Sequence, residues 1–156
     1  MRRLLFGATL VTLLAAAGCS GPAGEPLVAT TLTGQFKGQT FTPAFGVATV
    51  YKGSNVIALG DGPVNCGSAQ QNDPPMGTTA TFSVPSLDVG ASASVFVDII
   101  QYRGGNFDGV GSSGGTVTLT AVSAASVAGT IGFSYTDSMS QIYGLSGDFE
   151  VTRCPM

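Results

Sequence analysis

The chain has 156 residues, of which six are basic and nine are acidic, and its formal net charge is −3. Charged residues make up 10% of the chain, well below the usual quarter, so serine, threonine, asparagine and glutamine supply most of the polarity. Beyond Arg2 and Arg3 at the N-terminus, the four remaining basic residues are scattered along the sequence, which excludes a nucleic-acid surface and a polybasic lipid-binding surface.

The N-terminus is typical of a secretory signal peptide. A positively charged start precedes an uncharged apolar run over residues 4–17, which is shorter than the roughly 20 apolar residues that span a bilayer. The run ends in AAGC, which resembles a bacterial lipobox and implies cleavage before Cys19 and lipidation of its sulfur. We therefore expect residues 1–18 to be a lipoprotein signal peptide. The alternative is an ordinary secretory signal followed by an unrelated cysteine.

The residues after Cys19 predict a location and a tether. Ser20 stands where aspartate would retain a lipoprotein in the inner membrane, so the resemblance implies default sorting to the outer membrane. The segment SGPAGEPLVA over residues 20–29 is rich in glycine and proline and has no periodicity. Residues 19–29 are thus expected to be the lipidated cysteine and a flexible tether, and the protein to be exported and lipid-anchored to the cell envelope.

Residues 30–156 predict a single β domain. Short runs rich in β-branched and aromatic residues alternate with turn residues, and no segment keeps a helical period beyond one turn. Two hairpins come first, with turns at Lys37-Gly38 and over residues 52–55. The elements expected next are a long loop over 61–77, a strand over 79–84, a strand over 94–102 that is apolar on both faces, and a glycine-rich loop over 103–115.

Three alternating strands follow, over residues 116–123, 127–137 and 145–151. Period-2 counting predicts which of their side chains face inward: Val117, Leu119, Ala121, Ile131, Phe133, Tyr135, Leu145, Gly147, Phe149 and Val151. Eight or nine short strands separated by turns predict an all-β fold, an antiparallel β-sandwich or barrel.

Cys66 and Cys154 are the cysteines left once Cys19 is assigned to the lipobox. In an exported chain they are expected to form a disulfide, because a zinc site needs four ligands and the chain has no histidine. Alternation along the last strand points Cys154 outward. We therefore predict a disulfide at the rim of the sandwich; the alternative is a bulge near Thr152-Arg153 that turns the cysteine inward.

Several segments resemble those of a group of small, uncharacterised bacterial lipoproteins. They are the hairpin TLTGQFKGQTFTP, the internal loop cysteine, GTVTLTAVS, and the ending LSGDFEVTRCP. The resemblance spans most of residues 30–155 and rests on turns, core positions and one cystine. It implies a β-type envelope domain and brings no catalytic residues with it.

The sequence offers little for catalysis. The chain lacks histidine, the commonest general base near neutral pH. Residues 111–115, GSSGG, match a nucleophile elbow, but they lie in a predicted loop instead of between a strand and a helix. Asp98 is the one acid in a strongly apolar strand, and we expect it to face solvent or accept a hydrogen bond. We predict no enzymatic activity; a hydrolase using two converging carboxylates is the least favoured alternative.

Calcium is the one metal that the sequence suggests. Asn106 and Asp108 lie in a glycine-rich segment and offer oxygen ligands together with backbone carbonyls. Turn formation explains such residues equally well, because asparagine and aspartate bond their own backbone there. No cofactor is predicted.

The predicted function is a lipid-anchored envelope domain with a non-enzymatic interaction or structural role. Its expected partners are the membrane, through the lipid, and an envelope protein or glycan, with no nucleic acid. The alternative is a binder of a small apolar or saccharide ligand, favoured by an interior cavity lined with phenylalanine and tyrosine. Candidate contacts for such a ligand are Tyr51, Tyr102, Tyr135 and Tyr143.

Overall fold

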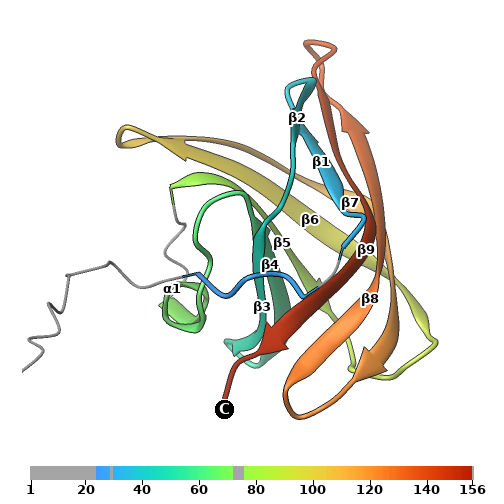
Figure 1. The fold of residues 1–156 in the computed structure, drawn as a ribbon. Coiled ribbons are helices and arrows are strands. Elements are labelled where there is room, and N and C mark those ends of the chain that lie inside the picture. The colour runs from blue at the N-terminus through green and yellow to red at the C-terminus, as the bar shows by residue number, and fades with distance from the viewer. Residues whose placement is uncertain (1–23, 29, 72–75, 156) are drawn as a thin grey trace, which may run out of the picture.

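The computed structural model describes residues 24–28, 30–71 and 76–155, and the predicted all-β fold is confirmed (Figure 1). Within these residues there are nine strands and one short helix. In chain order the elements are β1 (Thr33–Phe36), β2 (Gln39–Phe41), β3 (Phe45–Tyr51), β4 (Ser54–Gly60), α1 (Cys66–Gln71), β5 (Gly77–Val84), β6 (Ser92–Arg103), β7 (Asn106–Val122), β8 (Ser126–Thr136) and β9 (Ile142–Arg153).

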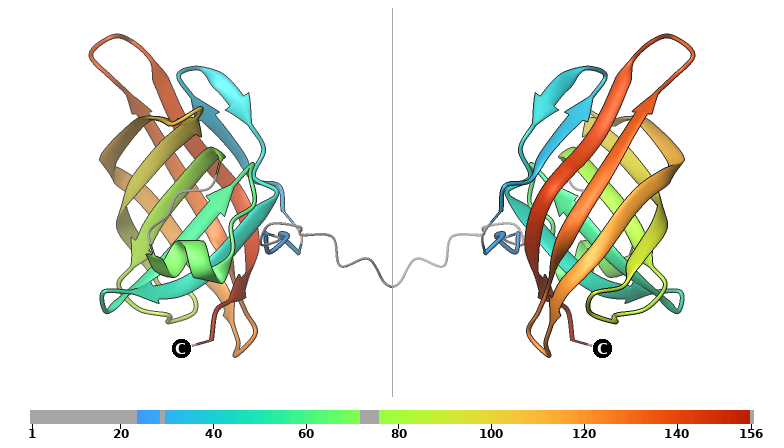
Figure 2. Two further views of the ribbon diagram at one scale, coloured as in Figure 1. Left: turned by 90° about the vertical axis from the view of Figure 1, so that its left-hand side faces the viewer. Right: turned by 90° about the vertical axis from the view of Figure 1, so that its right-hand side faces the viewer.

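All nine strands belong to one sheet that closes on itself at β9. From β3 to β9 each strand pairs antiparallel with the next one in the chain. The edge of β9 that does not pair with β8 pairs with two strands. Its first part pairs antiparallel with β1, and its end pairs in parallel with β3 at Val47↔Thr152. The two halves of the sheet thus face each other across one core, as in a sandwich, and hydrogen bonds join their edges, as in a barrel (Figure 2).

Inward-facing aliphatic and aromatic side chains fill the space between the two halves of the sheet. Most of the predicted inward positions are confirmed, among them Val117, Leu119, Ile131, Phe133, Leu145, Phe149 and Val151. Each fully buried side chain of this size contributes about 1.5–3 kcal/mol through removal from water.

The two predicted hairpin turns are confirmed. Lys37 and Gly38 have φ of 53° and 77°, and Lys52 and Gly53 have φ of 49° and 80°. Positive φ at both central residues is the geometry of a type I′ turn, whose twist matches that of the flanking strands.

The glycine-rich loop predicted over residues 103–115 is wrong, because β7 begins at Asn106 after a two-residue turn. Gly111 lies directly opposite Asp98 on β6, and a Cβ atom at Gly111 would come within 2.7 Å of the Phe96 ring. A Cβ atom at Gly115 would come within 2.6 Å of Val97. These glycines therefore make room for large side chains on the neighbouring strand. The elbow-like GSSGG lies in a strand, with a bulge where the register shifts opposite Val95/Phe96.

A second bulge, in β7, overturns the prediction that Ala121 faces inward. The register between β7 and β8 shifts between Leu119 and Ala121, so Thr120 has no partner in the ladder. The extra residue reverses the alternation, and Ala121, predicted to face inward, is exposed.

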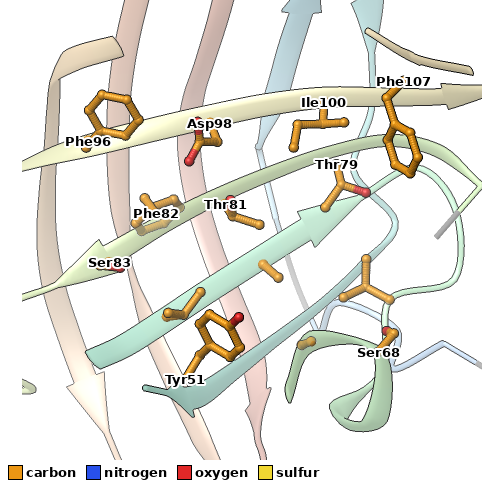
Figure 3. Close-up of a pocket in the computed structure, with 14 residues that line it drawn as sticks. Tyr51, Ser68, Thr79, Thr81, Phe82, Ser83, Phe96, Asp98, Ile100 and Phe107 are labelled. Carbon is orange, nitrogen blue, oxygen red and sulfur yellow. The ribbon is translucent and has the colours of Figure 1, made fainter. Parts of the chain in front are cut away.

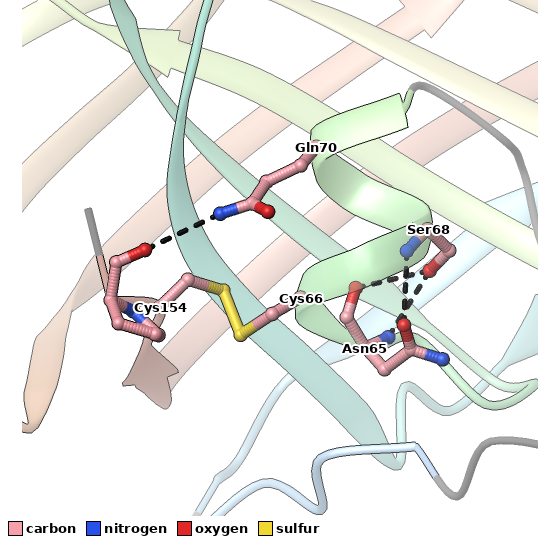
Figure 4. The surroundings of a disulfide bond; sticks show 6 residues. Asn65, Cys66, Ser68, Gln70 and Cys154 are labelled. Carbon is pink, nitrogen blue, oxygen red and sulfur yellow. Dashed lines mark hydrogen bonds between the residues drawn. A yellow bond between two sulfur atoms is a disulfide. The ribbon is translucent and has the colours of Figure 1, made fainter.

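The long loop predicted over residues 61–77 contains the helix α1, and residues 72–75 of that loop lie outside the described residues. Asn65 caps the helix: the Ser68 amide donates to Asn65 Oδ1 at 2.9 Å, and the Asn65 amide donates to Ser68 Oγ at 3.3 Å (Figure 4). This reciprocal capping stabilises a helix of six residues, which is too short to show an apolar period in the sequence.

Candidate functional site

The predicted disulfide between Cys66 and Cys154 is present, with the two Cα atoms 5.6 Å apart. Cys154 is buried together with Val47, Ala58 and Val64 in a second, smaller core between α1 and the outer face of β3 and β4. The cysteine points away from the main core, as alternation predicts. The disulfide is covered by α1 and does not lie at an open rim (Figure 4).

Residues 24–28, which were predicted to belong to a flexible tether, are docked on the domain. The Glu25 amide donates to the Val64 carbonyl at 2.7 Å, and the Leu27 amide donates to the Ala44 carbonyl at 3.0 Å. These bonds place residues 24–28 beside β3 and beside the loop that leads to α1. The predicted signal peptide over residues 1–18 and the predicted lipidation residue Cys19 lie outside the described residues.

A groove of about 480 Å³ lies on the outer face of β4, β5 and β6, next to α1 (Figure 3). This volume falls within the range of roughly 300–1,000 Å³ typical of ligand pockets. Five of the fourteen lining residues are serine, threonine or aspartate: Ser68, Thr79, Thr81, Ser83 and Asp98. Its larger apolar walls come from Tyr51, Val56, Val64, Phe96, Ile100 and Phe107.

Strand β6 supplies one wall of the groove and explains why its sequence is apolar on both faces. Val95, Val97 and Ile99 face the core, so the alternate side chains Phe96, Asp98 and Ile100 face outward into the groove. The core is filled by side chains, which counts against the interior cavity lined by phenylalanine and tyrosine that would favour a ligand binder; the groove lies on the outer face instead. Sequence reasoning missed most of its walls, since they come from five strands and a helix that are far apart in the chain.

Two aromatic rings stand exposed at the groove. Phe96 is 54% exposed and Phe107 is 62% exposed. The ring of Phe107 stacks on that of Tyr102, with centroids 4.5 Å apart and planes at 22°. Stacking of this kind holds the Phe107 ring in place, so that it presents a fixed apolar surface. Of the four candidate tyrosines, Tyr51 lines the groove and Tyr102 contacts it through its stacking on Phe107.

Asp98 is the one carboxylate among the described residues that line the groove. It is half-buried on the outward face of β6, opposite Thr81 on β5, so the expectation that it faces outward is confirmed. Desolvation raises the pKa of Asp98 above its ordinary value of 3.8. In the described part of the chain the one salt bridge joins Lys37 to Asp108, so Asp98 has no cationic partner there.

A buried hydroxyl lies beneath the groove without a partner. Thr79 is 6% exposed, and its Oγ1 forms no hydrogen bond with any described residue. An unpaired buried hydroxyl costs about 1–3 kcal/mol. Thr79 lies on the floor between α1 and the Phe107 wall, as Figure 3 shows.

The structure gives the two calcium candidates other roles. Asn106 opens β7 and pairs with Arg103 across the two-residue turn. The Asp108 carboxylate forms an ion pair with Lys37 Nζ, and this contact raises the pKa of Lys37 above its ordinary value. Among the described residues no three acidic or cysteine side chains gather into a group that could hold a metal ion.

No family model matches this chain, and neither a curated protein nor a solved structure matches it. In the part of the chain that the structure describes, the helix is neither long nor apolar enough to cross a membrane.

Proposed function

We propose that this chain is a lipid-anchored, non-enzymatic binding domain of the cell envelope that takes an apolar ligand in its outer groove. The groove itself carries the proposal, because two exposed phenylalanine rings and several aliphatic side chains meet there in a space of ligand size. An apolar ligand is favoured over a saccharide, because aliphatic and aromatic side chains form most of the groove lining.

The anchor belongs to the same proposal. The lipobox resemblance supports Cys19 as the lipid attachment site, with the outer membrane as the location. Cys19 precedes Gly24, where the docked segment begins, by five positions, a distance of at most about 18 Å in an extended chain. Val64 lines the groove and its carbonyl accepts the Glu25 amide, so the groove lies beside the point where the short tether begins.

The anchor is tested on protein purified from membranes of a cell that processes bacterial lipoproteins. Mass spectrometry of the mature N-terminus is expected to find a chain that begins at Cys19 and carries the added mass of acyl groups, since two or more chains give stable anchoring. The Cys19→Ser variant is expected to stay unprocessed or to leave the membrane fraction. A mature chain that begins elsewhere, or an unmodified Cys19, would contradict the anchor.

The groove is tested with N-phenyl-1-naphthylamine, a neutral dye whose fluorescence rises in apolar surroundings. Phe96→Ser and Phe107→Ser are each expected to weaken dye binding by about tenfold, because each removes a large part of the apolar wall.

Met139→Ser is the matched control for this measurement, since Met139 is 72% exposed and lies outside the groove. It is expected to bind the dye like the wild type. Equal binding by all four proteins, or equal loss in the control, would contradict the assignment of the groove.

A further inference from the structure

We infer that the groove selects apolar ligands that carry a cationic amine, and that Asp98 is the group that recognises the positive charge. The inference rests on the proposed function of the groove as a binding site, and it adds the chemical class of the ligand. It is carried by the charge of the groove and by the surroundings of Asp98.

The position of Asp98 among the lining residues is the first observation. The carboxylate stands on β6 between Phe96 and Ile100, on the face that lines the groove (Figure 3). It forms neither a hydrogen bond nor an ion pair with the described residues. The nearest wall residues are apolar or bear hydroxyls, and no lysine or arginine is among them. The groove therefore holds one uncompensated negative charge.

Gly111 on β7 brings this carboxylate close to an aromatic ring. It is the cross-strand partner of Asp98, and the space that its missing side chain leaves is occupied by Asp98 Oδ1 and by the Phe96 ring. A carboxylate next to an exposed aromatic ring offers an ammonium group both an ionic hydrogen bond and a cation–π contact.

The solvation of Asp98 and the net charge of the chain favour the same ligand. Lys52 is a cation beside the groove, with Nζ 5.1 Å from the centroid of the ring of the wall residue Tyr51, and it forms no ion pair with Asp98. Partial burial leaves the Asp98 carboxylate short of water, so a ligand ammonium replaces solvation that the fold has removed. The chain has six basic and nine acidic residues, and its net negative charge also attracts cations from a distance.

The test uses three probes with the same apolar tail and different head groups: octylammonium, 1-octanol and octanoate. Each probe competes with N-phenyl-1-naphthylamine for the groove of the full mature protein at neutral pH. Octylammonium is expected to displace the dye at about tenfold lower concentration than 1-octanol, the effect of one charge-assisted hydrogen bond. Octanoate is expected to be the weakest of the three, because its charge repels Asp98.

Two substitutions identify the responsible carboxylate. Asp98→Asn is nearly isosteric and is expected to bind octylammonium and 1-octanol equally, while its binding of 1-octanol shows that the groove is still folded. Asp88→Asn removes the same charge from an exposed loop outside the groove, and it is expected to keep the tenfold preference of the wild type.

The outcomes separate the two proposals. If neither the dye nor 1-octanol binds, the proposed function of the groove fails. If both bind but octylammonium is not preferred, or if the preference survives in Asp98→Asn, the groove remains a binding site and the inference about amines is overturned.

Discussion

Replacing Cys66 and Cys154 together by alanine is expected to lower the free energy of unfolding by about 4–5 kcal/mol. The bond joins residues 88 positions apart, so it removes much of the freedom of the unfolded chain. The variant also loses packing in the small core beneath α1, where Cys154 is buried beside Val64. Urea unfolding followed by far-ultraviolet circular dichroism measures the change.

The reduced wild type is the control for the disulfide. It is expected to lose about the same stability as the double variant, because both lack the constraint on the unfolded chain. A loss below about 1 kcal/mol in both proteins would contradict a stabilising bond between these two cysteines.

Phe149→Ala is expected to destabilise the domain by about 3–5 kcal/mol. The Phe149 ring is buried in the main core and meets the Phe82 ring edge to face, with centroids 5.9 Å apart. It also covers Gly129 on β8, where a Cβ atom would lie 3.0 Å from Phe149 Cζ. Truncation therefore leaves a cavity bounded by a glycine, which has no side chain to move into the space.

Phe107→Ala removes the same ring from the exposed groove wall and is the matched control. Its free energy of unfolding is expected to stay within about 1 kcal/mol of the wild type. Urea titrations of the two variants provide the comparison. Equal losses would show that Phe149 does not have the buried role that the fold gives it.

The strands and hairpin turns were predictable because their signals are local. Lys37-Gly38 and Lys52-Gly53 each stand between alternating runs, and positive φ at both positions explains why glycine follows lysine there. The disulfide was also predictable, since the assignment of Cys19 to the predicted lipobox leaves one pair of cysteines and thus a single possible pairing.

The wrong predictions concern residues whose role depends on packing against a neighbouring strand. Gly111 and Gly115 suggest a loop when the sequence is considered alone, yet each faces a bulky side chain on β6. The bulge at Thr120 is likewise a property of the pairing with β8 and has no local signal. The capping pair Asn65 and Ser68 was present in the sequence, but the helix that follows is too short for periodicity to reveal it.

The groove was the least predictable feature, because it combines Tyr51, Ser68, Asp98 and Phe107 from distant parts of the chain. One local signal pointed toward it. The segment over residues 94–102 is apolar on both faces apart from Asp98 and Gln101, which indicates that its outward face is covered or used. The groove is the feature that uses this face.

Amide NMR of the mature protein during a titration with 1-octanol tests the central claim, that the outer face of β4–β6 binds apolar ligands. We predict chemical-shift changes concentrated at Phe96, Asp98, Ile100 and Phe107, with the β8–β9 pair unaffected. Shifts spread evenly over the surface, or centred on β8 and β9, would contradict a binding site in this groove.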